Sequence, residues 1–386
     1  MTFVSAAGRH QPKTMLVFSF LVQNFYSSPP IIFIDAASVL PAKITTKEEM
    51  EKLCLRHPRF IEDYEKEINS TTVNHYPFKN TKKVLVKYGE IPGITQIAVA
   101  EIVDDFPPHS HEDMFELFYM LPYKPNHKDS GPGTLVNGNR DGQNNYVNLF
   151  NFGIGDLSKG EKAENYTYWP ENVTNDNEFD LVPDYKDQGG NSTAGTMLLF
   201  PPGIEHSGGI VQDSGPLQLI TIGAIPFPGE TVEQYKVAPE NSQAKTLKFG
   251  KTQLDELKPK PMKDNEKITK RVMLPLPEKQ YPKLPHFITF AESTLPKNQR
   301  NPKHIHADAY EVYFVMRGQG YMELDGEEKP IKTGSVVIVP PKIEHGPIAH
   351  KNSELQLLYF MIETPKGPCQ HGISSRDKGM NQHREL

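Results

Sequence analysis

Residue types that bind metal ions occur in the second half of the chain at a spacing that can bring them together. His304 and His306 lie two residues apart, which on a β-strand places both imidazoles on one face, and Glu311 follows after four more residues. His345 lies further along, five residues after Pro340. Three neutral imidazoles and one carboxylate suit a divalent transition metal such as Mn, Fe, Ni, Cu or Zn, and on an octahedral ion they leave two positions for water, substrate or dioxygen.

The first half of the chain repeats this pattern. A lone histidine is more often a hydrogen-bonded surface or core residue than a metal ligand. The spacing His-x-His-x4-Glu is expected only about 0.04 times by chance in a chain of this length and composition, yet it occurs twice. We therefore predict one divalent metal ion in each half, up to two per chain. The predicted ligands are His109, His111, Glu116, His206, His304, His306, Glu311 and His345.

The segments around these residues are also duplicated. Pro-Pro-Gly-Ile-Glu-His at 201–206 recurs as Pro-Pro-Lys-Ile-Glu-His at 340–345, and Leu-Gln-Leu at 217–219 recurs at 355–357. The matches follow the same order in both halves, so the chain contains one domain twice.

Each copy consists of short runs rich in β-branched and aromatic residues, which predict strands of a sandwich or barrel. With Gly 28 and Pro 34 the chain is rich in turn-forming residues. The predicted strands are 83–87, 95–102, 114–121, 197–200 and 217–225 in the first copy, and 287–290, 310–316, 320–324, 335–339 and 355–362 in the second. Short helices are expected only at the margin, through about residue 55 after a capping box at 45–48, and at 59–68.

The two copies differ in length between the glutamate and the last histidine. Glu116 and His206 are 90 residues apart, whereas Glu311 and His345 are 34 apart. The first copy therefore carries about 56 additional residues, in an insertion at about 124–192 that is either a lid over the first site or a glycosylated surface loop. The predicted organisation is 1–40, a signal peptide or N-terminal arm; 41–225, the first domain; 226–285, a linker rich in Lys and Pro; 286–365, the second domain; and 366–386, a C-terminal tail.

Several features indicate the secretory pathway, with the protein either secreted or in the ER lumen. Basic residues precede an apolar run at 15–22 that resembles a signal peptide, although an ordinary N-terminal strand has the same pattern, and the run is too short to span a membrane. The last four residues, 383–386, loosely resemble an ER-retrieval signal. Cys54 and Cys369 either form one disulfide or remain buried thiols. The predicted N-glycosylation sites are Asn69, Asn165, Asn172 and Asn191.

Both halves resemble the cupin superfamily, whose motifs are G(x)5HxH(x)3-4E(x)6G and G(x)5PxG(x)2H. The matching residues are the eight predicted ligands together with Gly195, Pro201, Gly203, Gly318, Gly334 and Pro340. Val103 and Asn298 replace the leading glycine, Tyr123 replaces the glycine after Glu116, and Lys342 replaces the glycine of the second motif. The resemblance covers about residues 80–365 and implies an all-β bicupin, with a double-stranded β-helix (jelly-roll) barrel in each half.

The resemblance leaves the reaction open, because cupins include dioxygenases, decarboxylases, isomerases and metal-free storage proteins. Retention of all eight ligands favours an enzyme. In quercetin-dioxygenase-like bicupins a metal-bound carboxylate takes a proton from the substrate, which implies Glu116 and Glu311 as catalytic residues. The apolar residues near the first site suit an aromatic substrate or form barrel core; they are Phe106, Met114, Phe115 and Phe118.

Oxalate-converting bicupins are the second comparison. Oxalate decarboxylases have an arginine three residues before the first ligand histidine, where this chain has Phe106 and Asn301. Asn301 resembles the equivalent asparagine of oxalate oxidases and is a candidate substrate contact, or it shapes the turn before Pro302.

The lead hypothesis is therefore a metal-dependent oxidoreductase, a dioxygenase acting on an enolic, phenolic or carboxylic substrate. An oxalate oxidase or decarboxylase is the alternative, and a non-enzymatic binding or storage glycoprotein is the second alternative. We expect a small-molecule substrate and dioxygen as partners, with no membrane span. The net charge of −6 argues against nucleic acid, and a homo-oligomer is compatible with the sequence.

Overall fold

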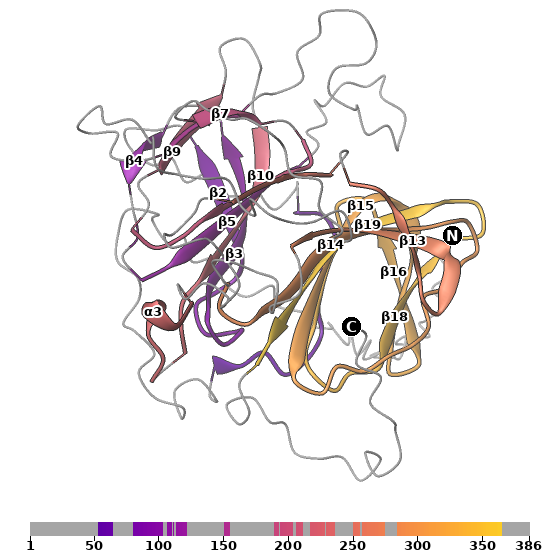
Figure 1. Ribbon diagram of the computed structural model, residues 1–386. Coiled ribbons are helices and arrows are strands. Elements are labelled where there is room, and N and C mark those ends of the chain that lie inside the picture. The colour runs from indigo at the N-terminus through magenta and orange to yellow at the C-terminus, as the bar shows by residue number, and fades with distance from the viewer. Residues whose placement is uncertain are drawn as a thin grey trace, which may run out of the picture. The chain divides into compact units, whose positions relative to one another are not determined.

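The computed structural model is almost entirely β-structure (Figure 1). For strands β4, β6, β7 and β11 it describes the backbone alone, and the same holds for three residues of β9. The described residues are 53–64, 80–102, 106–109, 111, 113–121, 150–154, 189–192, 194–203, 206–210, 217–227, 229–235, 250–254, 257–274 and 284–364.

The second copy forms a nine-stranded antiparallel sheet arranged around one long strand, β15 (Ala309–Leu324). The first half of β15 pairs with β17 and β19, and its second half pairs with β16 and β18. One strand thus takes part in both walls of the barrel. The other strands of this sheet are β1 (Arg59–Ile61), β12 (Lys260–Met262), β13 (Asn265–Leu274), β14 (Phe287–Leu295), β16 (Glu327–Lys332), β17 (Val336–Val339), β18 (His345–Ala349) and β19 (Leu355–Glu363).

The first copy forms a six-stranded and a four-stranded sheet, in the orders β11-β8-β5-β10-β3-β2 and β4-β9-β6-β7. All pairs between these strands are antiparallel. The strands are β2 (Thr81–Val86), β3 (Ile94–Ile102), β4 (Phe106–His109), β5 (Phe115–Met120), β6 (Phe150–Ile154), β7 (Gly189–Ser192), β8 (Thr196–Phe200), β9 (His206–Ile210), β10 (Leu217–Ala224) and β11 (Gly250–Gln253).

Strand pairing divides the 56 additional residues of the first copy into two segments. Ile154 faces His206 as Leu324 faces His345, so β6 corresponds to the second half of β15. Ile154 lies 38 residues after Glu116, whereas Leu324 lies 13 residues after Glu311. The next strand starts 35 residues after Ile154 in the first copy, but three residues after Leu324 in the second. The predicted insertion at 124–192 therefore contains two strands of the barrel, β6 and β7, with additional residues before β6 and between β6 and β7.

Three predicted elements differ from the structure. The helix predicted at 59–68 is wrong over Arg59–Ile61, which form β1, because the edge of β17 offers these residues backbone hydrogen bonds. Tyr64 is helical, and 65–68 lie outside the described residues. The strands predicted at 310–316 and 320–324 are one continuous β15. The predicted linker carries helix α3 (Val232–Tyr235) and strands β11, β12 and β13, which join the sheets; the domain boundaries remain predictions.

Other predictions lie outside the described residues. These are the signal peptide, the C-terminal tail, the helix at 45–52, and the sequons at Asn69, Asn165 and Asn172, while Asn191 lies in β7, where only the backbone is described. Cys54 is disulfide-bonded, and Cys369 is the only other cysteine in the sequence. Disulfides are typical of oxidising compartments, but the secretory pathway remains a prediction. Within the described part of the chain, no helix is long and apolar enough to cross a membrane.

The core follows the two-residue period of the strands. In β15, Val312 and Phe314 belong to a large cluster that also contains residues of the first copy, such as Leu117. Tyr313 and Val315 point to the opposite face and belong to a second cluster, inside the second barrel. Because both faces of the central strands are buried, their sequences are nearly continuous apolar runs.

The segment 53–64 connects the two copies through an ion pair. Arg59 lies in β1, which pairs with β17 of the second barrel. Its guanidinium binds both carboxylate oxygens of Glu90 in the first copy, at 3.0 and 2.7 Å, and donates to the carbonyl of Leu85 at 2.8 Å. The two side chains are only 16% and 18% exposed, so water weakens this pair little.

Arg59→Met should therefore lower the free energy of unfolding by about 2 kcal/mol, because it removes the ion-pair partner of the Glu90 carboxylate, which then keeps the backbone N–H of Lys87 at 2.8 Å. Lys332→Met is the matched control, because Lys332 also binds the segment, through Glu62 at 2.8 Å, but with side chains 51% and 78% exposed. Because water screens this exposed pair, the substitution should leave the free energy of unfolding nearly unchanged. Urea unfolding measures both, and equal losses in the two variants would contradict the role given to Arg59.

Candidate metal centres

Backbone pairing brings together the predicted ligands of the second copy. His304 and His345 exchange two backbone hydrogen bonds, each 3.0 Å long, so their side chains start from adjacent points. Glu311 lies near the start of β15. The amide of Lys342 donates to the carbonyl of His306 at 2.7 Å. Lys342 has φ +69°, in the left-handed region that glycine adopts most easily. This explains why the cupin motif has a glycine at the position where this chain has Lys342.

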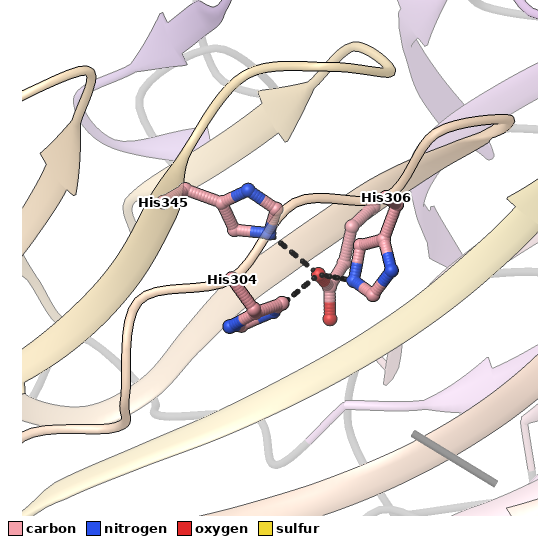
Figure 2. Close-up of side chains that lie close together, drawn as sticks. His304, His306 and His345 are labelled. Carbon is pink, nitrogen blue, oxygen red and sulfur yellow. Dashed lines mark hydrogen bonds and ion pairs between the residues drawn. The ribbon is translucent and has the colours of Figure 1, made fainter. Parts of the chain in front are cut away.

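Three imidazoles converge on one oxygen of Glu311 (Figure 2). Its Oε2 lies 2.7 Å from Nε2 of His345, 3.0 Å from that of His306 and 3.5 Å from that of His304. The four ligand atoms all lie within 4.8 Å of one another. Ligands about 2.1 Å from a common ion are at most about 4.2 Å apart, so this donor set needs only small adjustments to hold a transition metal.

The tautomers of two of these histidines are also set by backbone contacts. Nδ1 of His304 lies 2.9 Å from the carbonyl of Pro302, and Nδ1 of His345 lies 2.8 Å from that of Ile343. A carbonyl only accepts, so each Nδ1 carries the proton and donates it. Nε2, which points at Oε2 of Glu311, would give up its hydrogen and offer its lone pair to a bound metal ion, which is the arrangement typical of ligand histidines.

The carboxylates of both centres are ionised. Burial alone would raise the pKa of Glu311, but attraction to His306 and the hydrogen bonds from His304, His306 and His345 outweigh it and hold that pKa well below its usual range. The pKa of Glu116 is likewise held low, because the contacts of His111 and His206 outweigh the effect of burial. Each centre therefore offers a negative charge to a cation at neutral pH.

The first copy has a similar centre. Nε2 atoms of His111 and His206 lie 3.2 and 3.0 Å from Oε2 of Glu116, and these three residues form a second group of possible ligands. The structure describes only the backbone of His109, which faces His206 across β4 and β9 as His304 faces His345. Seven of the eight predicted ligands thus lie in two clusters, and the backbone of the eighth has the corresponding position.

The apolar residues named from the sequence separate into two groups. Phe118 lies on the same face of β5 as Glu116, with its ring 6.2 Å from that of His206, and Met114 lies 3.3 Å from Thr95. Phe115 points to the opposite face, where it belongs to the core cluster, so it lines no site. For Phe106 only the backbone is described.

Two residues beside the first centre were missed from the sequence. The ring of Phe200 stacks on His206 at 4.2 Å and 15°. The hydroxyl of Thr221 donates to Oε1 of Glu116 at 3.1 Å, and both groups are buried. The repeat could have indicated Thr221, because it follows the duplicated Leu-Gln-Leu segment by two residues, where the second copy has Tyr359.

Comparison with known proteins agrees with this fold. Residues 291–361 match the cupin domain family. An uncharacterized protein of Methanocaldococcus jannaschii is 31% identical over 100 residues, 26% of this chain and 75% of that protein. A protein of Pseudomonas aeruginosa described as glyoxylate-induced has a similar structure, with TM-score 0.50, 9% identity, and coverage of 87% of this chain and 96% of its own. An oxalate decarboxylase of Lactobacillus farciminis has TM-score 0.46 and 12% identity, over 81% of this chain and 87% of its own. The chain belongs to the cupin superfamily.

Proposed function

We propose that this chain is a metal-dependent bicupin oxidoreductase, a dioxygenase that acts on an enolic, phenolic or carboxylic oxygen compound. The convergence of three imidazole nitrogens on one oxygen of the buried Glu311 carries the proposal. A bound divalent ion would supply a positive charge that favours an anionic oxygen ligand, and would mediate its reaction with dioxygen. Both oxygen atoms would enter the product, so the reaction needs no separate reductant.

In this proposal the residues of the chain bind and deprotonate the substrate. Glu311, or Glu116 in the first centre, would accept the proton of the substrate's hydroxyl, so that the substrate binds as its anion. Aromatic side chains beside both centres favour a substrate with a planar ring. Phe118 and Phe200 lie near His206 in the first barrel, and Tyr313 lies 6.1 Å from His345 in the second.

The buried side chain of Asn301 is a candidate substrate contact. Asn301 is 8% exposed, and among the described residues no donor lies within hydrogen-bonding distance of its buried Oδ1. Its backbone N–H donates to the carbonyl of Pro347, in the same strand as His345. That oxygen would accept a hydrogen bond from an enolic or phenolic hydroxyl, whereas the oxalate dianion carries only acceptors and would not supply one.

The test is an assay of the full chain loaded with Mn, Fe, Ni or Cu, under air and under nitrogen. Flavonols, catechols, enediols and oxalate are the substrates, and oxygen uptake and carbon dioxide release are followed. The proposal expects oxygen uptake with an enolic or phenolic compound and no turnover under nitrogen. Carbon dioxide from oxalate without net oxygen uptake would favour the decarboxylase. Inactivity across the panel, with both centres loaded, would favour a binding or storage protein.

A further inference from the structure

The two metal centres differ in how the ligand carboxylate is held. In the first, Oε2 of Glu116 faces the imidazoles of His111 and His206, while Oε1 accepts the hydroxyl hydrogen of Thr221 at 3.1 Å. Thr221 is 4% exposed and Glu116 7% exposed, so water does not compete for this hydrogen bond. The carboxylate of Glu116 is therefore fixed by a contact at each of its oxygens.

Within the described part of the chain, Glu311 in the second centre has polar contacts at one of its two oxygens. His304, His306 and His345 all approach Oε2. Among the described residues, no donor lies within hydrogen-bonding distance of its Oε1. Tyr359 takes the place of Thr221, and its ring stacks on Tyr313 at 6.1 Å.

The strands beside the two glutamates show the same difference. Glu116 faces Gly223 across the sheet. Thr95 and Met114 fill the space that a side chain at Gly223 would need, because a Cβ there would lie 2.0 Å from Oγ1 of Thr95. Glu311 instead faces Met361, a flexible side chain that can move. Thr95 and Met114 thus pack into the space across from Glu116, whereas the residue across from Glu311 is Met361.

We propose that the two centres have different roles. Thr221 is a positioning residue that fixes Glu116, so that the first centre holds its ion with an unchanging set of ligands. The second centre, where one oxygen of Glu311 is uncommitted and the carboxylate can rotate, is the one that admits the anionic oxygen of the substrate. This inference rests on the proposed metal-dependent function and assigns its chemistry to the second barrel.

The test uses two full-length proteins that each keep one centre, His304→Ala/His345→Ala for the first and His111→Ala/His206→Ala for the second. Each is loaded with Mn²⁺ and followed by electron paramagnetic resonance, with azide as a small anionic probe. Azide should change the spectrum of the second centre and leave that of the first unchanged. An effect of azide on the first centre alone, or an equal effect on both, would overturn the division of roles.

Substitution of Thr221 tests the positioning role. In the protein that keeps the first centre, Thr221→Val preserves the shape of the side chain but removes the hydroxyl, and should weaken Mn²⁺ binding about tenfold and alter its spectrum. Thr221→Ser, which keeps the hydroxyl, should retain most of the affinity. Unchanged binding and spectrum in Thr221→Val would refute the role.

A variant in the otherwise unaltered chain separates positioning from folding. There Thr221→Val should leave the second centre's affinity unchanged, and a loss at both centres would show an effect on the fold and overturn the inference. These measurements do not depend on turnover. Failure of the unaltered chain to bind Mn²⁺ or any other transition metal at either centre would instead remove the proposed function itself.

Discussion

His306→Ala should lower the metal content by about one equivalent per chain and leave the other equivalent in place. Nε2 of His306 lies 3.0 Å from Oε2 of Glu311, so the substitution removes one of four donors from the second centre. Loss of one donor of four commonly removes a large part of a site's affinity. The first centre uses other strands and other residues, so its ion should remain.

Elemental analysis of the purified protein, before and after dialysis against a chelator, measures this result. His57→Ala is the matched control, because His57 is exposed and belongs to neither cluster; it should keep both equivalents. His206→Ala should give the reciprocal result, with the second ion retained. Loss of all metal in His306→Ala would show that the two centres are coupled or share one ion, and the two-centre description would be wrong.

The ligands could be predicted because their signal is local and duplicated. Two histidines at i and i+2 project to the same side of an extended segment, although in the structure His304 makes only an isolated bridge and His306 lies outside any strand. The repeated Pro-flanked segment locates His206 and His345 beside them. The buried strands were predictable for the same reason, since apolar runs bounded by turn residues define β3, β5, β10 and β19 closely.

The remaining features depend on contacts between distant parts of the chain. Arg59–Ile61 form a strand only because the edge of β17 is available for pairing, which no local propensity encodes. Strand β7 consists of Gly, Asn and Ser, so its composition does not distinguish it from the residues around it. Strand β6 has the sequence Phe-Asn-Phe-Gly-Ile, an apolar alternation that was missed within the predicted insertion. Thr221 was missed because its partner, Glu116, is 105 residues away and only the pairing of β10 with β5 brings them together.

Glu311→Gln should lower kcat by about 100-fold or more, and this is the largest effect expected of any single substitution here. Glu311 is 3% exposed, and the neighbouring imidazoles hold its pKa well below the usual range, so the carboxylate is ionised at neutral pH. In the proposed function it accepts the proton of the bound substrate's hydroxyl. The carboxamide has nearly the same shape but cannot act as a base, and general base catalysis contributes about 10²–10⁴-fold. Rates are to be expressed per bound metal, because the amide is also a weaker ligand.

Glu292→Gln is the matched control for this variant. Glu292 is another buried glutamate, 2% exposed and paired with Arg271 at 2.7 Å, but it belongs to neither ligand cluster. Its substitution should reduce stability through the loss of that ion pair and leave kcat per metal unchanged. Glu116→Gln should reduce metal retention in the first centre more than it reduces kcat. Full activity per metal in Glu311→Gln, together with loss of activity in Glu116→Gln, would move the catalytic role to the first barrel and contradict the assignment made from Thr221.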